Sequence, residues 1–466
     1  MKRLAFFMLG LFLLLGCSES GTNKATHNPV TIDENALKIG FFAPGRVVED
    51  FASKVDIQLY NLSTVEHLEK TLQLASEQGL KLFLALELPA MYMENISLNY
   101  NFESEIYKKN LPPARLIKLR RTVSRDVFAH YLAPFYEAIK KHPEAVEAIF
   151  LGDEPYLNGI SFEDLDQMAL DIRYLLDSVG LNKVKIGAVF ASAMFNASFA
   201  QHIDATSSAY TRSIDEYFSR LEAKESRGEA SAEELRWLSV IGDIRLTTYD
   251  KANNMYLGGG LPTSLDIVGF DFYLSTLLQD EVHNESLQWF AKQKLHPACD
   301  GFENTKITEL RQALSFWDAE EKMTNDLALQ AKQAAKDKAI LDQWYTCRTE
   351  STLALLEREL YKSGRPEREI LLVSESSSNG LMAFDKNGNR LADQQNDLIK
   401  ARVVDEVTRA INVVKKYPIN HLLFFTYESQ FDWFIKLTID GAEGIPEALH
   451  LIYQNARRNH EPLPAN

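Results

Sequence analysis

Two glutamates lie near the ends of strongly apolar segments, where a carboxyl group can do chemistry. Glu154 belongs to the segment 146–155 (VEAIFLGDEP), and Glu375 belongs to the segment 370–376 (ILLVSES). A carboxyl group that keeps its proton can act as a general acid, and a second one that stays ionised can act as a nucleophile. Such a pair works only if the fold brings both groups to one place, so the elements that carry them must be identified.

Eight short segments of this apolar kind recur along the chain, separated by helical or longer stretches. They cover residues 37–44, 55–61, 81–88, 146–155, 184–191, 265–273, 370–376 and 421–429. Several are almost continuously apolar, which is typical of parallel strands covered by helices outside and by packed side chains inside. Helix-spaced apolar residues lie between them at 64–78, 125–141, 162–178, 397–416 and 446–457. The sequence therefore predicts an α/β fold, a (β/α)8 TIM barrel, over residues 37–466.

Two connections are much longer than the others. They follow the fifth and the sixth predicted strands, and residues 212–246 and 325–345 within them have helical character. We interpret both as helical insertions in the barrel rather than as separate domains.

In barrels of this class the catalytic groups come from the carboxyl ends of the strands. Glu154 would end the fourth strand and Glu375 the seventh. This arrangement resembles glycoside hydrolase clan A, and the resemblance covers residues 37–457. It implies that Glu154 is the general acid/base, that Glu375 is the nucleophile, and that neither a cofactor nor a metal is needed. The alternative for each glutamate is a rim residue that caps the next helix or pairs with a cation.

The resemblance also implies a set of substrate-binding residues. Clan members usually have Asn directly before the acid/base, whereas this chain has Asp153, which can accept but not donate a hydrogen bond when ionised. Its negative charge would also favour the protonated form of Glu154. The other candidates are Glu87 at the end of strand three, Tyr273 at the end of strand six, and Tyr427 and Trp433 following strand eight. Aromatic residues are also ordinary packing residues, and Glu87 is structural or solvated by default.

The first residues form an export signal. Lys2 and Arg3 precede an apolar run at 4–15, which is shorter than the roughly 20 residues of a membrane helix, so a cleaved signal peptide is favoured. Residues 14–17 (LLGC) resemble the bacterial lipobox, which implies that residues 1–16 are removed and that Cys17 carries lipid. Residues 17–36 are polar and fit a flexible tether. The expected location is the bacterial envelope, at the outer membrane and facing the periplasm or the cell surface. The alternative is an ordinary signal peptide or short anchor with an incidental cysteine.

Charge and cysteine content narrow the partners further. The formal net charge is −15, and loss of Lys2 and Arg3 with the signal peptide makes it −17, which disfavours nucleic acid and anionic membrane surfaces. Cys299 and Cys347 remain as an even pair in an oxidising compartment, so a disulfide between them is favoured over free thiols. The bond would close the second insertion on itself. The sequence offers no zinc cluster.

Two functions remain open. The first is a retaining glycoside hydrolase or transglycosylase that acts on a polysaccharide or oligosaccharide through a covalent glycosyl-enzyme intermediate. The second is a noncatalytic barrel that binds a glycan in envelope or exopolysaccharide assembly, an alternative that Asp153 and the long insertions keep open. Both take carbohydrate as the partner and reach the membrane through the N-terminal lipid. The sequence does not predict the sugar, its linkage or the oligomeric state.

Overall fold

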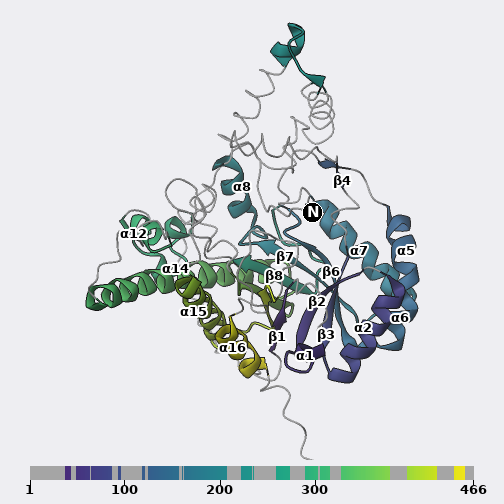
Figure 1. Ribbon diagram of the computed structural model, residues 1–466. Coiled ribbons are helices and arrows are strands. Elements are labelled where there is room, and N and C mark those ends of the chain that lie inside the picture. Colours follow the sequence, from purple (N-terminus) through teal and green to yellow (C-terminus); the bar gives the residue numbers. More distant parts are fainter. Residues whose placement is uncertain are drawn as a thin grey trace, which may run out of the picture.

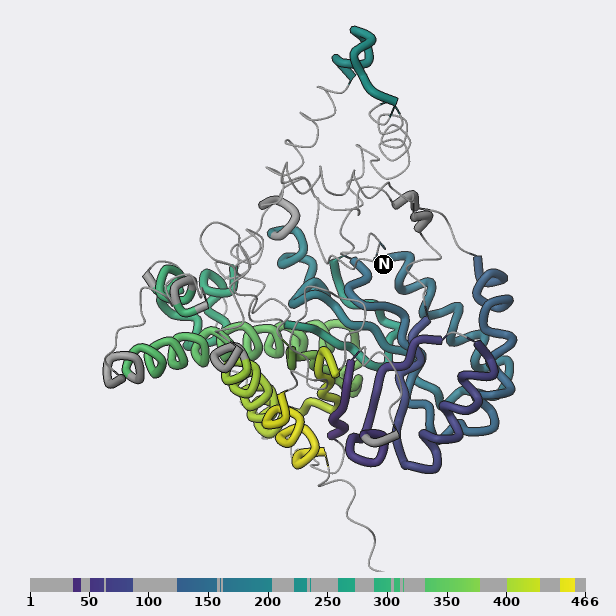
Figure 2. Tube along the Cα trace, in the orientation of Figure 1, coloured from purple at the N-terminus to yellow at the C-terminus, as the bar shows by residue number. Residues whose placement is uncertain are grey.

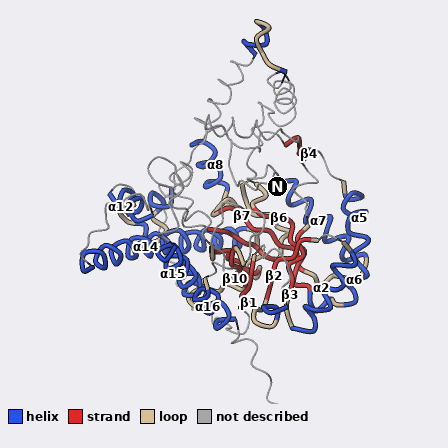
Figure 3. The backbone as a smooth tube through the Cα atoms, in the orientation of Figure 1, coloured by secondary structure: helices blue, strands red, loops and turns tan. Residues whose placement is uncertain are grey.

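The chain folds into a closed barrel of strands surrounded by helices, as a computed structural model shows (Figures 1 and 3). The structure describes residues 37–42, 49–62, 64–86, 93–95, 118–120, 124–156, 160, 162–206, 222–232, 235, 259–272, 289–302, 305–314, 327–377, 396–427 and 445–456. Figure 2 shows that the chain winds around the barrel largely in sequence order. Barrel strands that follow one another along the chain are therefore neighbours in space.

Eight parallel strands form the barrel. They are β1 (Lys38–Phe41), β2 (Ile57–Asn61), β3 (Lys81–Ala85), β6 (Val146–Asp153), β7 (Lys185–Ala191), β8 (Ile267–Phe272), β9 (Glu369–Glu375) and β10 (His421–Phe425). They hydrogen-bond in the closed order β1-β10-β9-β8-β7-β6-β3-β2. Each predicted segment coincides with one strand to within a few residues, so the predicted (β/α)8 barrel is confirmed. The sequence analysis did not predict a separate antiparallel pair, β4 (Met93–Asn95) and β5 (Lys118–Arg120).

Alternate residues of each strand enter two different cores. A small apolar cluster inside the barrel includes Phe83 and Phe150. A larger cluster between the strands and the helices includes their neighbours Leu82 and Ile149. This alternation is the period of two that a β-strand imposes on its side chains. A rim residue two positions beyond an interior residue therefore also faces the barrel axis, unless a bulge intervenes.

Helices lie around the barrel (Figure 1). They are α1 (Glu49–Ala52), α2 (Val65–Gln78), α5 (Arg125–Leu132), α6 (Tyr136–Lys141), α7 (Phe162–Ser178), α8 (Ala197–Thr206), α12 (Thr305–Leu314), α14 (Leu327–Lys362), α15 (Asn396–Val414) and α16 (Pro446–Ala456), with 3-10 turns η2 (Ala133–Phe135), η3 (Pro143–Ala145) and η5 (Pro297–Cys299). Figure 1 shows α2, α5, α6 and α7 on one side and α14, α15 and α16 on the other. The helices predicted between the strands are thus present.

Helix α14 is longer than the helical stretch predicted at 325–345. It has 36 residues, and its first part extends away from the barrel beside α12 (Figure 1). Its later part is buried against the barrel through residues such as Trp344 and Leu356. The helix continues because residues 327–362 contain neither glycine nor proline, and Gly364, with a φ of 71°, follows its end. The predicted insertion and the barrel helix after β8 are therefore parts of one element.

A disulfide joins Cys299 of η5 to Cys347 of α14. Both cysteines are fully buried, and they are 48 residues apart in sequence. Closing a loop of this length lowers the conformational entropy of the unfolded chain. In the chain-entropy treatment this stabilises the folded state by about 4 kcal/mol. The bond therefore ties the start of the second insertion to the part of α14 that packs on the barrel.

The predicted signal peptide (1–16), the tether (17–36) and the lipidated Cys17 lie outside the described residues. Within the part of the chain that the structure describes, no helix has both the length and the apolar character needed to cross a bilayer.

We expect Gly40→Ala to disrupt the barrel. A Cβ at Gly40 of β1 would lie 1.6 Å from the carbonyl oxygen of Ile57 in β2, and a backbone atom cannot turn away as a side chain can. Overpacking commonly costs 1–3 kcal/mol, so we expect the free energy of unfolding to fall by about 3 kcal/mol or more, as measured by chemical denaturation. The control is Gly364→Ala, where nothing lies within 4 Å and only the positive φ is penalised, by about 1–2 kcal/mol. Equal losses in both variants would contradict the close approach of β1 and β2.

Candidate active site

The end of β6 is irregular where it delivers Glu154. Its register with β7 shifts between Phe150 and Asp153, so that Asp153 pairs with Val189, a residue of the interior cluster. A bulge of this kind changes the direction of the side chains that follow it. The backbone N–H of Glu154 donates to the carbonyl oxygen of Val189 at 2.8 Å, and Glu154 has a φ of 46°. Non-glycine residues rarely adopt this left-handed conformation, and such residues concentrate at functional sites.

Glu375 is the last residue of β9, and its side chain is fully buried. It follows Leu371 and Val373 of the interior cluster at intervals of two residues, so the strand directs it toward the barrel axis. It pairs in register with Phe425 of β10. Glu375 is therefore a carboxyl group that faces the interior at the rim of the barrel.

Asp271 of β8 is a third carboxyl group at the same rim. It follows the interior residue Ile267 by four positions on the same strand face, and its exposed fraction is only 4%. The backbone N–H of Ser192, just beyond β7, lies 3.1 Å from the carbonyl oxygen of Asp271 and 3.3 Å from Oδ1, so that it donates to both. Ser192 has a φ of 49°, which makes it a second left-handed residue at a strand end close to Glu154.

Asp271 is under the electrostatic influence of both acids at the end of β6. Burial raises the pKa of Asp271 well above its usual range, and the charges of Glu154 and then Asp153 raise it further, while hydrogen bonding from Ser192 opposes this rise. Carboxylates have effects of this kind on one another when they lie close together. We therefore treat Asp153, Glu154 and Asp271 as one group, the acidic cluster.

The acidic cluster and Glu375 occupy one rim of one barrel. Strands β6 and β9 are separated in the sheet by β7 and β8, and β8 carries Asp271. The carboxyl ends of parallel strands lie at the same end of a barrel, so Glu154 and Glu375 share this end. Acid/base chemistry needs carboxyl groups in different environments, and a partly buried group of interacting acids on β6 and β8 differs from a fully buried glutamate on β9.

The other predicted substrate contacts fall in different places. Tyr427 packs against Phe41 and Phe51, with ring centroids 4.9 and 4.6 Å away, and is 5% exposed. These are the contacts of a core residue, so the ring has little surface to offer a substrate. Glu87, Tyr273 and Trp433 lie outside the described residues, and their roles stay predictions.

Two residues at the rim were missed by sequence reasoning. Ser192 belongs to no recognisable motif, and Arg348 lies in a long helix whose packing partner the sequence does not reveal. The Nη2 atom of Arg348 donates to Oγ of Ser192 at 2.5 Å, and Arg348 is only 2% exposed. An arginine on the same helix face as the apolar Trp344 was the available signal, because arginine is rarely buried without a partner.

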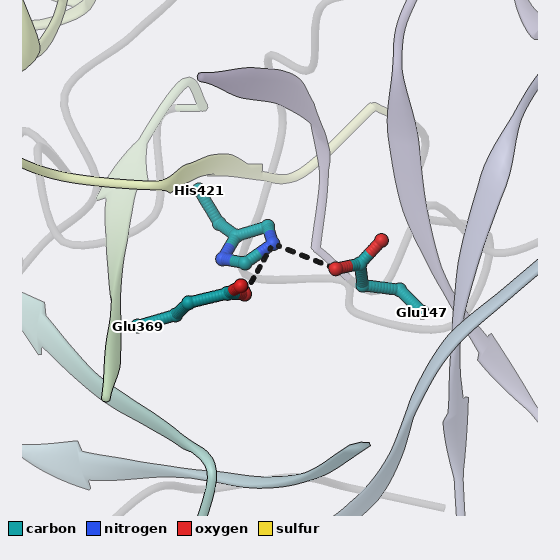
Figure 4. A group of neighbouring side chains, drawn as sticks. All are labelled: Glu147, Glu369 and His421. Carbon is teal, nitrogen blue, oxygen red and sulfur yellow. Dashed lines mark ion pairs between the residues drawn. The ribbon is translucent and has the colours of Figure 1, made fainter. Parts of the chain in front are cut away.

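A second polar group occupies the opposite end of the barrel, which we call the barrel floor. Glu147, Glu369 and His421 have ligand atoms within 4.8 Å of one another, a spacing that could hold a metal ion. Figure 4 shows His421 between the two carboxylates, with Nε2 3.4 Å from Glu147 and 3.6 Å from Glu369. However, Nζ of Lys185 lies 2.6 and 2.7 Å from the same carboxylates, and Nζ of Lys38 lies 3.1 Å from Glu147. A metal ion would have to displace these ammonium groups, so we assign the floor a structural role.

Comparison with known proteins gives no family. No family model matches the chain, and no curated protein matches it. Among solved structures, a glucosidase from Croceicoccus marinus is 12% identical, with 90% of this chain and 68% of that chain covered and a TM-score of 0.37. A glycoside hydrolase family 5 enzyme from Prevotella bryantii B14 is 9% identical, with 91% and 98% covered and a TM-score of 0.33. A GH1 β-glucosidase from Exiguobacterium antarcticum B7 is 10% identical, with 89% and 86% covered and a TM-score of 0.35.

These structural neighbours are glycoside hydrolases by name. Their identities and TM-scores are too low to carry an argument about activity, which must come from the chain's own residues.

We expect the barrel floor to make stability depend on pH through His421. Burial lowers the pKa of His421, although Glu147 opposes this, so the folded chain holds the ring neutral while the unfolded chain takes up a proton near pH 6.5. This contribution to stability is present above pH 6.5 and is lost as the pH falls. His421→Gln should remove the part of the fall in the free energy of unfolding that begins as the pH drops below about 6.5, as measured by urea denaturation at several pH values.

The control for this experiment is His67→Gln, which changes an exposed histidine of α2. It should leave the curve of stability against pH unchanged. A His421→Gln curve parallel to that of the wild type would show that His421 does not titrate on unfolding as described.

Proposed function

We propose that this protein is a retaining glycoside hydrolase, or a transglycosylase that uses the same covalent intermediate. The observation that carries the proposal is that Glu154 and Glu375 stand at the carboxyl rim of one closed barrel, at strand ends three positions apart. Reacting groups in (β/α)8 enzymes come from this rim. A glycosidic bond held across the rim would have one carboxyl group on each side.

In the proposed reaction Glu375 attacks the anomeric carbon and forms a glycosyl ester, while Glu154 gives its proton to the leaving oxygen. Glu154 then takes a proton from water, the water oxygen attacks the anomeric carbon, and the bond to Glu375 breaks. If a sugar hydroxyl replaces the water, the result is transglycosylation. The acidic cluster supports the role of Glu154, because neighbouring carboxylates favour the protonated form that a general acid needs.

The proposal extends to substrate class and location. A chain with a formal net charge of −15 and acids at the rim is better suited to a neutral or cationic glycan than to a polyanion. With lipid on Cys17 and residues 17–36 as a tether, the barrel would be held at the bacterial envelope, in the outer membrane, facing the periplasm or the cell surface.

A noncatalytic glycan-binding barrel in envelope or exopolysaccharide assembly is the second candidate. Asp153 favours it. The bulge in β6 brings Asp153 into register with the interior residue Val189, directly before Glu154, where clan A has an amide. Such a protein would bind glycan at the same rim without cleaving it.

Replacing each glutamate tests the first candidate. We expect Glu375→Gln to abolish turnover of all substrates, because the covalent step has no nucleophile. Glu154→Gln should lower turnover by about 10²–10⁴-fold with natural glycans, but much less in the first step with aryl glycosides, whose leaving groups need no proton. The measurement is hydrolysis of a panel of aryl glycosides and polysaccharides by the full-length chain in mild detergent.

The matched control is Glu357→Gln, an exposed glutamate of α14. It should retain wild-type activity. Glycan binding without turnover by the wild type would leave the second candidate, and activity that survives both rim substitutions would mean that other carboxyl groups act.

Replacing Asp153 tests the coupling within the acidic cluster. Asp153→Asn restores the amide of clan A and removes one negative charge beside Glu154. Because the loss of a like charge favours ionisation, the basic limb of the pH profile of kcat/KM should move down by about 0.5–1 pH unit. Asp126→Asn, at an exposed position of α5, is the control. An unchanged profile for Asp153→Asn would contradict the coupling.

A further inference from the structure

The guanidinium group of Arg348 is buried in an aromatic enclosure. Its carbon Cζ lies 4.7 Å from the ring centroid of Phe272, 5.0 Å from that of Phe290 and 5.3 Å from that of Trp344. Aromatic faces attract a cation, but they do not replace the water that a buried charge loses. A guanidinium group in such a place requires an anion nearby.

Arg348 is connected to Asp271 through hydrogen bonds of Ser192. Arg348 donates to Oγ of Ser192, and the backbone N–H of Ser192 donates to Oδ1 of Asp271. Burial lowers the pKa of Arg348 to about 9, and the charge of Asp271 opposes this fall. Ser192 therefore links the cation on α14 to the carboxyl group on β8, because its hydroxyl accepts from Arg348 and its backbone N–H donates to Asp271.

We propose that Arg348 is a positioning residue that holds Ser192 and Asp271 beside Glu154 and balances the charge of the acidic cluster. The proposal deepens the proposed function and rests on it for its catalytic consequence. Arg348 acts through Ser192 and Asp271, and its buried position gives it no role as a substrate contact.

The charge-balancing role of Arg348 follows from the charged groups that lie near Asp271 among the described residues. Strand β6 contributes the negative groups Asp153 and Glu154, and α14 contributes the positive group Arg348. Strand β7 leads to the uncharged Ser192, and the neighbouring β9 ends in Glu375. Removing the one cation in this group would make the remaining acids hold their protons to higher pH. The pH at which Glu154 ionises would then depend on Arg348 of α14.

Helix α14 makes three other contacts near Arg348, two with η5 and one with β9. Cys347, next to Arg348, is bonded to Cys299, and Oγ of Ser351 lies 3.3 Å from Sγ of Cys299. The hydroxyl of Tyr345 lies 3.5 Å from Oγ of Ser374, the residue before Glu375. Tyr345 also packs against Phe272 of β8, with ring centroids 5.6 Å apart, so α14 contacts the residues next to Asp271 and Glu375. This attachment allows a helix residue to hold a fixed position beside the acidic cluster.

The test uses four variants and a control in the full-length chain in mild detergent. Arg348→Met removes the cation, Arg348→Lys keeps a charge without the planar group, and Asp271→Asn removes the partner. Arg348→Met combined with Asp271→Asn completes a double-mutant cycle. The control is Arg358→Met, the same change at an exposed position of the same helix.

The first measurement is the pH profile of kcat/KM. We expect Arg348→Met to move the basic limb up by about one pH unit or more, because the carboxyl groups lose a nearby opposite charge. Arg348→Lys should restore part of this shift, and in the Asp271→Asn background Arg348→Met should have little effect. A shift of the same size with and without Asp271 would overturn the proposal, because Arg348 would then not act through Asp271.

The second measurement needs no activity. It compares the free energy of unfolding between pH 5 and 8. Asp271 has a raised pKa in the folded state, so its contribution is present at low pH and is lost as the pH rises through that pKa. Loss of Arg348 raises the pKa of Asp271 further, so the decline should continue to higher pH than in the wild type, and Asp271→Asn should remove the difference. Parallel curves for the wild type and Arg348→Met would overturn the proposal, whereas absence of turnover in the wild type would overturn only the proposed function.

Discussion

Closure of the sheet between β1 and β10 is the constraint on which the rest of the structure depends. Lys38 pairs with His421 and Phe41 pairs with Phe424 along this seam, which joins the first strand of the barrel to the last. Once the seam is closed, the carboxyl ends of all eight strands lie around one opening. Glu154 and Glu375 are far apart in sequence, and barrel closure is what places them at a common site. The packing of Gly40 against Ile57 belongs to the same constraint, because β1 must approach both of its neighbours closely.

Charged groups are arranged differently at the two ends of the barrel. At the floor, lysine ammonium groups lie within ion-pair distance of Glu147 and Glu369, so the charges there are matched where they lie. At the rim, the acidic cluster lies near a guanidinium group that reaches it through a serine. Matched pairs suit a structural role, whereas acids whose protonation depends on their neighbours suit chemistry. This contrast favours the rim as the site of the proposed function, independently of the resemblance to glycoside hydrolases.

The strands could be predicted because a parallel strand is covered on both faces and appears in the sequence as an apolar run. Their order followed from the alternation with helices. The bulge that brings Asp153 into the interior register could not be predicted, because it depends on the match between β6 and β7. The packing of Tyr427 depends on Phe41 and Phe51, which lie at the other end of the chain. Arg348 was missed for the same reason, since its role depends on residues of other strands. Local patterns thus identified the elements and placed Glu154 and Glu375 at strand ends, while the neighbours of these glutamates required the fold.

The position of the disulfide has a consequence for how the protein is made. Cys299 and Cys347 both lie in the connection between β8 and β9, so the bond links no two strands of the barrel. Both cysteines also precede β9 and β10 in the chain. In the proposed export, which begins at the amino end, the bond can therefore form while the last two strands have yet to emerge. Disulfide formation does not require the barrel to be closed, because the bond joins two parts of one connection. A chain that forms the bond early can still pair its strands in the native order.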